Sequence, residues 1–238
     1  MQAGGQTGSQ ARTQGISFAL NARAIPPGAI DDLDGVYQRT ALYYSRKIAQ
    51  FGPQPSGVDW RCEPTQQLRF VQLLKLCDSV GDFSLNDVGC GYGALLGYLA
   101  RRRRLHRVDY LGIDIAPAMI EAARGAWPRH KKRFVAAASS PRTADYSVAS
   151  GVFNVRLDVD LAVWERFVER TLRQMRETSS LGFAFNLMTP VPPTVDSPAE
   201  LYRPAPDQWI AFCERELGAK VQTLTGYGLH EQTLLVRY

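Results

Sequence analysis

One short stretch decides the fold: Asp87-Val88-Gly89-Cys90-Gly91-Tyr92-Gly93-Ala94. Its three glycines fall between a strand expected at 85–88 and a helix expected at 94–103. Glycines at such a junction allow a ligand to approach the backbone closely. From Gly89 onward the loop matches Gly-x-Gly-x-x-Gly/Ala, the fingerprint of dinucleotide-binding folds. The sequence therefore predicts a ligand site at this loop.

From the strand at 85–88 onward, predicted strands and helices alternate along the chain. This order predicts a parallel sheet covered by helices on both faces, with ligands at the carboxyl ends of its strands. The last two strands are predicted to form an antiparallel hairpin. The predicted helices cover 34–51, 65–77, 94–103, 118–125, 161–177 and 207–217, and the predicted strands 85–88, 110–114, 133–138, 146–155, 182–188, 219–225 and 232–237.

The 238 residues suit one large α/β domain with an appendage. The Gly-, Gln- and Ser-rich start predicts a disordered tail over residues 1–25. The helices that precede the glycine loop predict a cap or lid over 26–80. The alternating pattern predicts the main ligand-binding domain over 81–238.

The composition favours a cytoplasmic protein. No apolar run is long enough to span a bilayer, and the start lacks the apolar core of a secretory signal. The four cysteines are widely spaced, with no Cys-x-x-Cys pair and no clustered histidine, which predicts free thiols and no metal site. Nothing in the sequence indicates an oligomeric state.

The net charge of +5 mildly favours anionic partners. Much of the excess lies in Arg101-Arg102-Arg103-Arg104 and the following His106-Arg107. A basic run at the end of a helix is usually solvated and complements the helix dipole. No aromatic residues interleave this run, as a surface that stacks bases requires, so nucleic acid is not the expected partner.

Asp114 ends the next expected strand at the separation that the dinucleotide fingerprint also has, so it does not distinguish between adenosine-bearing ligands. Asp87, which lies two residues before the first glycine, argues against a pyrophosphate. A carboxylate at this position would repel a pyrophosphate and attract a cation. The two expected helices before the loop also differ from a dinucleotide fold, which usually opens on its fingerprint strand.

Two motifs resemble those of a known family. Asp87-Val88-Gly89-Cys90-Gly91-Tyr92-Gly93 is similar to the first motif of class I S-adenosylmethionine-dependent methyltransferases, and Gly112-Ile113-Asp114-Ile115 to the second. The order of elements extends the resemblance from Asp82 to the end of the chain. It implies an α/β, Rossmann-like three-layer sandwich with a mostly parallel seven-stranded sheet, the last strand antiparallel, and an N-terminal helical lid.

The resemblance also implies roles for the residues of these motifs. Gly89, Gly91 and Gly93 would let the backbone approach the methionine part of S-adenosylmethionine. Asp87 would lie near the ammonium group, directly or through water. Asp114 would accept hydrogen bonds from both ribose hydroxyls, which the two oxygens of one carboxylate can do.

The adenine side of the site departs from the family pattern. Ile115 would pack on the adenine face, and Met119 would line the same pocket. The family often has an acidic residue after the third strand, whereas this chain has Phe134-Val135-Ala136-Ala137-Ala138-Ser139-Ser140. Ser139 or a backbone carbonyl must therefore replace the usual partner of the adenine amino group.

The fourth strand ends beside the cofactor's sulfonium in this family. Ser150 would line the cofactor there, and Asn154 either hydrogen-bonds the acceptor or only caps the strand; Asn186 has the same two interpretations. The segment Ser150-Gly151-Val152-Phe153-Asn154 differs from the Asn/Asp-Pro-Pro-Tyr/Phe signature of enzymes that methylate nucleic-acid bases or glutamine.

Two segments are candidate lids: the N-terminal helices within 26–80 and the Pro-rich loop over 189–206. In the first, Tyr44 would exclude water and offer its ring to the sulfonium, with Trp60 beside it, although Tyr43 and Tyr44 also suit the packed core of the cap. In the second, Tyr202 is a catalytic candidate, and Arg203 could clamp a substrate carboxylate. No paired carboxylates suggest a magnesium site.

The sequence leads to one main hypothesis, a methyltransferase that acts on a small-molecule acceptor, in particular a specialised metabolite. One alternative keeps the fold but acts on S-adenosylmethionine itself, closing its aminobutyrate chain into a ring of the azetidine-2-carboxylate type and releasing methylthioadenosine. The others are an RNA or protein methyltransferase that docks through 101–104, and a subunit that binds the cofactor without consuming it.

Overall fold

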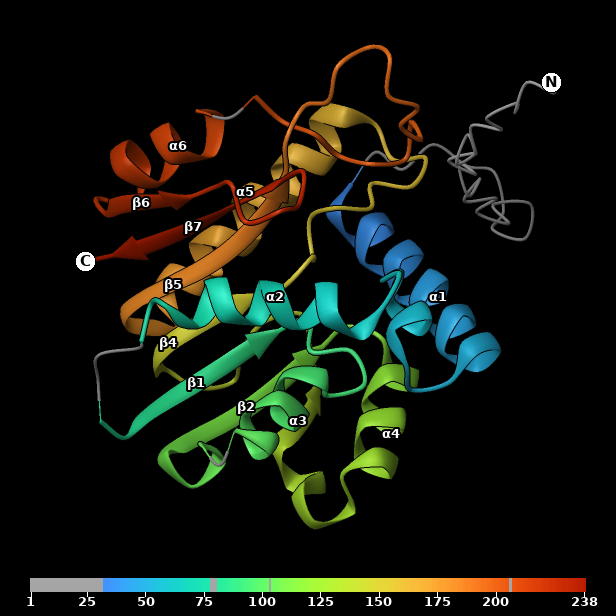
Figure 1. Ribbon diagram of the computed structural model, residues 1–238, viewed down its shortest axis with the longest axis vertical. Helices are drawn as coiled ribbons and strands as arrows, with labels where there is room; N and C mark the ends of the chain where they lie inside the picture. Colours follow the sequence, from blue (N-terminus) through green and yellow to red (C-terminus); the bar gives the residue numbers. More distant parts are fainter. Residues whose placement is uncertain (1–31, 78–80, 103, 206) are drawn as a thin grey trace, which may run out of the picture.

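The computed structural model describes residues 32–77, 81–102, 104–205 and 207–238. The predicted tail over 1–25 lies outside the described residues, as does the start of the predicted cap. The described parts form a seven-stranded sheet with helices on both faces (Figure 1).

The sheet has the order β3-β2-β1-β4-β5-β7-β6. β1 to β5 are parallel to one another, whereas β7 runs antiparallel to both β5 and β6. The order reverses at β1, which lies between β2 and β4, and a ligand crevice forms at such a switch point. The predicted mixed sheet is confirmed. The strands are Phe83–Val88 (β1), Val108–Asp114 (β2), Phe134–Ala136 (β3), Ala144–Ala149 (β4), Ser179–Met188 (β5), Lys220–Leu224 (β6) and Glu231–Arg237 (β7).

Helices bury apolar side chains against each face of the sheet. α2, α3 and α4 cover one face, and α5 and α6 cover the other (Figure 1). Neighbouring residues of β7 show the alternation of a strand buried on both faces, since Leu235 packs on the α2 side and Leu234 and Val236 on the α5 side. The helices are Leu33–Phe51 (α1), Glu63–Leu74 (α2), Ala94–Arg101 (α3), Pro117–Ala126 (α4), Leu161–Glu177 (α5) and Gln208–Glu216 (α6), with short turns of 3-10 helix at Pro55–Val58 (η2), Leu105–Arg107 (η3) and Pro128–Arg133 (η4).

Helix α1 lies over the carboxyl ends of the strands. It begins at Asp32, whose side chain accepts a hydrogen bond from the Gly35 amide at 2.7 Å, and it ends at Gly52 with φ +72°. It packs against α4 and α5, as a lid would. Helix α2 instead packs on β5 and β7, so it belongs mainly to the layer that covers the sheet.

The predicted strand over 146–155 was wrong in its second half. β4 ends at Ala149, and the chain then turns at Gly151, which has φ +74°. Val155 makes only an isolated bridge to Leu201. A residue with positive φ cannot continue a strand, so residues 150–155 leave the sheet and contribute a turn to its carboxyl edge.

Candidate functional site

The glycine loop after β1 is folded in a way that only glycine adopts without strain. Gly89, Gly91 and Gly93 have φ values of +70°, +53° and +81°. A Cβ atom at Gly89 would lie 2.5 Å from Cγ2 of Val152, and one at Gly93 would lie 2.8 Å from Cζ of Phe134. The backbone of this loop therefore packs directly against its neighbours, and Gly89, which is exposed, and Gly91 line the pocket described below.

Asp114 connects the glycine loop to the end of β2. Its Oδ2 accepts a hydrogen bond from the Gly91 amide at 2.9 Å, and its Oδ1 accepts one from the Ala116 amide at 2.9 Å. Burial raises the pKa of Asp114 to about 6, although these two hydrogen bonds oppose the shift. A carboxylate oxygen accepts more than one hydrogen bond, so both oxygens remain able to bind ligand hydroxyls.

Asp87 is the second buried carboxylate, and its residue is 2% exposed. The hydroxyl of Tyr110 on β2 donates a 2.6 Å hydrogen bond to its Oδ2. Burial raises the pKa of Asp87 to about 7; the Tyr110 hydrogen bond opposes this shift, and the charge of Asp114 adds to it.

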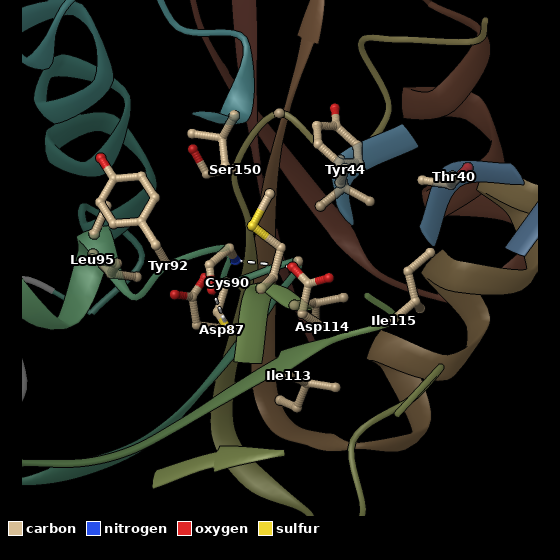
Figure 2. A pocket seen from close by; sticks show the side chains of 18 of the residues that line it. Thr40, Tyr44, Asp87, Cys90, Tyr92, Leu95, Ile113, Asp114, Ile115 and Ser150 are labelled. Carbon is tan, nitrogen blue, oxygen red and sulfur yellow. Dashed lines mark hydrogen bonds between the residues drawn. The ribbon is translucent and has the colours of Figure 1, made fainter. Parts of the chain in front are cut away.

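A pocket opens around these two carboxylates, with about 960 Å³ of space that includes its open mouth. Figure 2 shows Asp87 and Asp114 together, with Ser150 and Tyr44 across the pocket from them. Among the described residues that line the pocket there are these two carboxylates and no Lys, Arg or His. This charge pattern favours a cation and disfavours a phosphate.

The buried hydroxyls at the pocket that have no hydrogen-bond partner among the described residues include Thr40 Oγ1 on α1 and Ser150 Oγ just after β4. A buried polar atom without a hydrogen bond is costly, so such atoms in a pocket point to a ligand that supplies one. With the glycine loop and the two carboxylates, they fit S-adenosylmethionine, a cationic adenosine compound without phosphate.

Most of the predicted cofactor residues do meet at this pocket. Gly93 lies beneath the loop as the N-cap of α3, and Ser139 is outside the lining, where Ala137 and Ala138 lie instead. The predicted residues that line the pocket are Tyr44, Trp60, Asp87, Gly89, Gly91, Asp114, Ile115, Met119 and Ser150.

The structure does not bring Asn154 and Tyr202 to the pocket. Both are buried after the turn at Gly151, and the Tyr202 amide donates to the Asn154 carbonyl at 2.9 Å. The Tyr202 hydroxyl donates to Glu165 at 3.1 Å and accepts from Trp209 at 2.9 Å, which ties it to α5 and α6. Their catalytic role stays a prediction that this arrangement does not support.

The contacts of the Arg203 side chain also do not support its predicted role, which is to clamp a substrate carboxylate. Its guanidinium donates to Ser197 Oγ at 2.9 Å and to the Thr189 carbonyl at 2.7 Å, so it holds its own loop together. Tyr202 and Arg203 line a separate hollow beside α5.

Several lining residues were missed by sequence reasoning. They lie on helices whose other faces pack in the core. The apolar periodicity of these helices therefore did not distinguish residues that line the pocket from residues of the core. These residues are Tyr37, Thr40, Gln66, Phe70, Phe167 and Thr171, from α1, α2 and α5.

Within the described ranges, His, Cys, Asp and Glu side chains form no group of three or more that could hold a metal ion. None of the described helices is both long and apolar enough to cross a membrane. The four cysteines all lie in described segments and carry free thiols.

Comparisons with known proteins agree with this geometry. Residues 86–178 match the family described as "Methyltransferase domain". A Mycobacterium tuberculosis (strain ATCC 25618 / H37Rv) protein named "Putative methyltransferase Rv1506c" is 41% identical over 165 residues, which is 69% of this chain and 98% of that protein.

Solved structures share the fold at low sequence identity. The DhpI-SAM-HEP complex matches with a TM-score of 0.58 at 11% identity, covering 89% of this chain and 100% of that one. Human N-acetylserotonin methyltransferase in complex with SAM matches with a TM-score of 0.57 at 14% identity, covering 92% of this chain and 61% of that one.

Proposed function

The chain belongs to the methyltransferase family, and from this membership we propose that it transfers the methyl group of S-adenosylmethionine to a small-molecule acceptor. The observation that carries the proposal is the pocket's charge: two buried carboxylates, and no basic residue among the described lining. S-adenosylmethionine carries an ammonium and a sulfonium and no phosphate, so it complements this pocket where a dinucleotide would not.

In this proposal, different residues of the pocket contact different parts of the cofactor. The bound cofactor supplies a methyl group that is already activated. Asp114 holds the ribose hydroxyls while its own bonds to Gly91 and Ala116 fix its orientation. Asp87 attracts the ammonium group. Ile115 and Met119 pack on the adenine, and the chain then needs only to place the acceptor in line with the methyl carbon.

Helix α1 closes the acceptor side. Tyr44 stays protonated, because burial raises its pKa well above the usual value and the charges of Asp59 and Asp114 add to the shift. It therefore acts as a neutral wall that excludes water and as a hydrogen-bonding group, and not as a base. The unpartnered hydroxyls of Thr40 and Ser150 are the groups that we expect to contact the bound molecules.

For the acceptor we propose a specialised metabolite, and for the setting a biosynthetic pathway in the cytoplasm. The free thiols suit a reducing compartment. DhpI, crystallised with SAM and HEP, and the human N-acetylserotonin enzyme cover most of this fold, which supports a small acceptor over a macromolecule.

The raised pKa of Asp87 favours one second candidate. A carboxyl group with a pKa of about 7 can accept the proton of the cofactor's ammonium group near neutral pH. The freed amine could then form a bond to the chain carbon attached to sulfur as the carbon–sulfur bond breaks. That reaction closes the ring and releases methylthioadenosine.

The experiment that separates these functions is mass spectrometry of the protein incubated with S-adenosylmethionine, first alone and then with a metabolite extract. Transfer predicts an intact cofactor in the first sample and S-adenosylhomocysteine with a methylated product in the second. Methylthioadenosine in the first sample would establish the ring closure instead. Binding without consumption in either sample would indicate a silent subunit or an RNA or protein acceptor.

Calorimetric titration provides the matching control. We expect wild-type protein to bind S-adenosylmethionine and Asp114→Ala to lose at least about tenfold in affinity, because a buried charge-assisted contact is removed. No binding by the wild-type protein would contradict the proposed cofactor itself.

A further inference from the structure

One wall of the pocket is held by buried polar residues to which the proposed reaction gives no role. Trp60 and Gly151 form this wall, and both line the pocket. They touch closely: a Cβ atom at Gly151 would lie 2.3 Å from Cζ2 of Trp60. Behind them lie Arg69 of α2, Asn186 of β5 and Glu231 of β7, all buried.

These five residues form a closed ring of contacts, which we call the polar ring. The Arg69 guanidinium stacks on the Trp60 indole, with its Cζ 3.8 Å from the ring centroid. It pairs with Glu231 through two hydrogen bonds, one of them from Nε to Oε2 at 2.8 Å. Asn186 Nδ2 donates to the same Oε2 at 2.8 Å, and Asn186 Oδ1 accepts from the Gly151 amide at 2.8 Å.

The hydrogen bonds of the polar ring allow only one orientation of the Asn186 side-chain amide. An ionised Glu231 accepts hydrogen bonds and donates none, so Asn186 must turn its amino group toward Glu231 and its carbonyl toward Gly151. The Arg69 and Glu231 side chains are 8% and 2% exposed, so neither charge can move into water without breaking the pair. The ring therefore fixes where Trp60 and the Gly151 turn stand.

The strand order tells which end of the cofactor this wall faces. Asp114, the partner of the ribose in the proposed function, ends β2, and the adenine side lies beyond it toward β3. Gly151 follows β4 and Asn186 lies in β5, on the other side of β1. The sulfonium end of the cofactor must extend in that direction, toward the wall.

We propose that Arg69, Asn186 and Glu231 are positioning residues that hold Trp60 and the Gly151 turn against the sulfonium end of the bound cofactor. This inference rests on the proposed function. Because Arg69 already covers the Trp60 ring, Trp60 contributes its edge and its fixed place to the wall. Loss of the ring should then impair recognition of the sulfonium end and spare recognition of the adenosine end.

The test is Arg69→Lys, measured by calorimetry with S-adenosylmethionine, S-adenosylhomocysteine and adenosine. Lysine keeps the charge but loses the two-pronged bond to Glu231 and the stacking on Trp60. We expect the affinity for S-adenosylmethionine to fall about tenfold, because loosely held walls lose well-oriented contacts. The affinity for adenosine should stay within about twofold, and that for S-adenosylhomocysteine should fall by an intermediate amount.

Arg142→Lys is the matched control. Arg142 is also held by hydrogen bonds within the sheet, to Asn86 Oδ1 at 3.2 Å and to Asp109 Oδ2 at 2.6 Å, but it does not line the pocket. Its substitution should lower the melting temperature while leaving the affinities for all three compounds within about twofold of wild type.

Trp60→Phe is the second variant, because Trp60 is half-buried and a smaller ring there should still fold. It should show the same selective loss for S-adenosylmethionine. Equal losses for all three compounds in both variants, or no loss, would overturn the positioning role while the proposed function stands. Failure of wild-type protein to bind S-adenosylmethionine would overturn both.

Discussion

The Tyr110 hydroxyl lies 2.6 Å from Oδ2 of Asp87 and donates a hydrogen bond to it from the neighbouring strand. Both residues are almost fully buried, at 1% and 2% exposure. Asp87 is held by this one side-chain donor at a place where burial opposes its negative charge. The bond therefore controls how much of the pocket's negative charge is present near neutral pH.

Removal of this donor should weaken cofactor binding in a way that higher pH repairs. In Tyr110→Phe the pKa of Asp87 rises further above about 7, since the hydrogen bond that stabilised the carboxylate is gone. Relative to wild type at the same pH, we expect roughly a three- to tenfold loss of affinity for S-adenosylmethionine at pH 7 and a smaller loss at about pH 8. Titrations at both pH values, with the buried Tyr98→Phe as control, test this; a loss that is no smaller at the higher pH would contradict it.

The affinity for S-adenosylmethionine should rise with pH between about 5 and 8. The pKa values of Asp114 and Asp87 are raised from 3.8 to about 6 and about 7, so both groups are neutral in acid and ionise across this range. A cationic ligand prefers the ionised forms. The affinity for neutral adenosine should depend less on pH, and equal slopes for the two ligands would argue against this assignment of charge.

The stability of the unliganded protein should change in the opposite direction. Because both folded-state pKa values are raised, the folded protein holds protons that the unfolded chain has released between pH 3.8 and about 7. These two groups favour folding fully below the unfolded value, and that contribution is lost as pH rises through about 6 and 7. Denaturant unfolding of Asp87→Asn should show a weaker fall in the free energy of unfolding over this range than the wild type.

Gly91→Ala should destabilise the protein and weaken the site together. Gly91 has φ +53°, and a Cβ atom there would lie 3.0 Å from Cγ1 of Val58. We expect a loss of about 1–2 kcal/mol in the free energy of unfolding and weaker cofactor binding, since the Gly91 amide orients Asp114. The control is Gly125→Ala in α4, where nothing lies within 4 Å, and it should be neutral or stabilising by up to about 1 kcal/mol.

Helix α1 should become more protected when the pocket is filled. It packs on α4 and α5 and contributes Tyr37, Thr40 and Tyr44 to the lining. S-adenosylhomocysteine should slow amide hydrogen exchange about tenfold in Leu33–Phe51, because local opening of the lid is then opposed by the ligand. Exchange in α6 should not change. Equal effects on both helices would indicate global stabilisation and no lid.

The fold was predictable because each helix and strand has a recognisable pattern in its own local sequence. The predicted helix over 161–177 has the bounds of α5, and the helix predicted over 34–51 differs from α1 by one residue. The antiparallel ending was predicted from the resemblance and from the short polar connection between the last strands. Two-faced burial, helix caps and glycine turns are local signals, and they act over a few residues.

The acceptor side was less predictable because it depends on contacts between distant segments. The turn at Gly151 packs closely against Trp60, which lies far away in the chain, so the local pattern did not indicate that β4 ends at Ala149. The expected role of Asn154 depended on that longer strand, and that of Tyr202 depended on the Pro-rich loop over 189–206 closing over the site. Tyr110 was missed because only the pairing of β1 with β2 brings its hydroxyl to Asp87.

The place of β7 has a consequence for how the protein is made. Residues 231–237 insert between β5 and β6, so the sheet has a gap until the ribosome has added them. Until then β5, a long strand rich in apolar residues, presents an unpaired edge in the nascent chain. Glu231, which completes the polar ring, belongs to the same segment, so the pocket wall and the sheet become complete together.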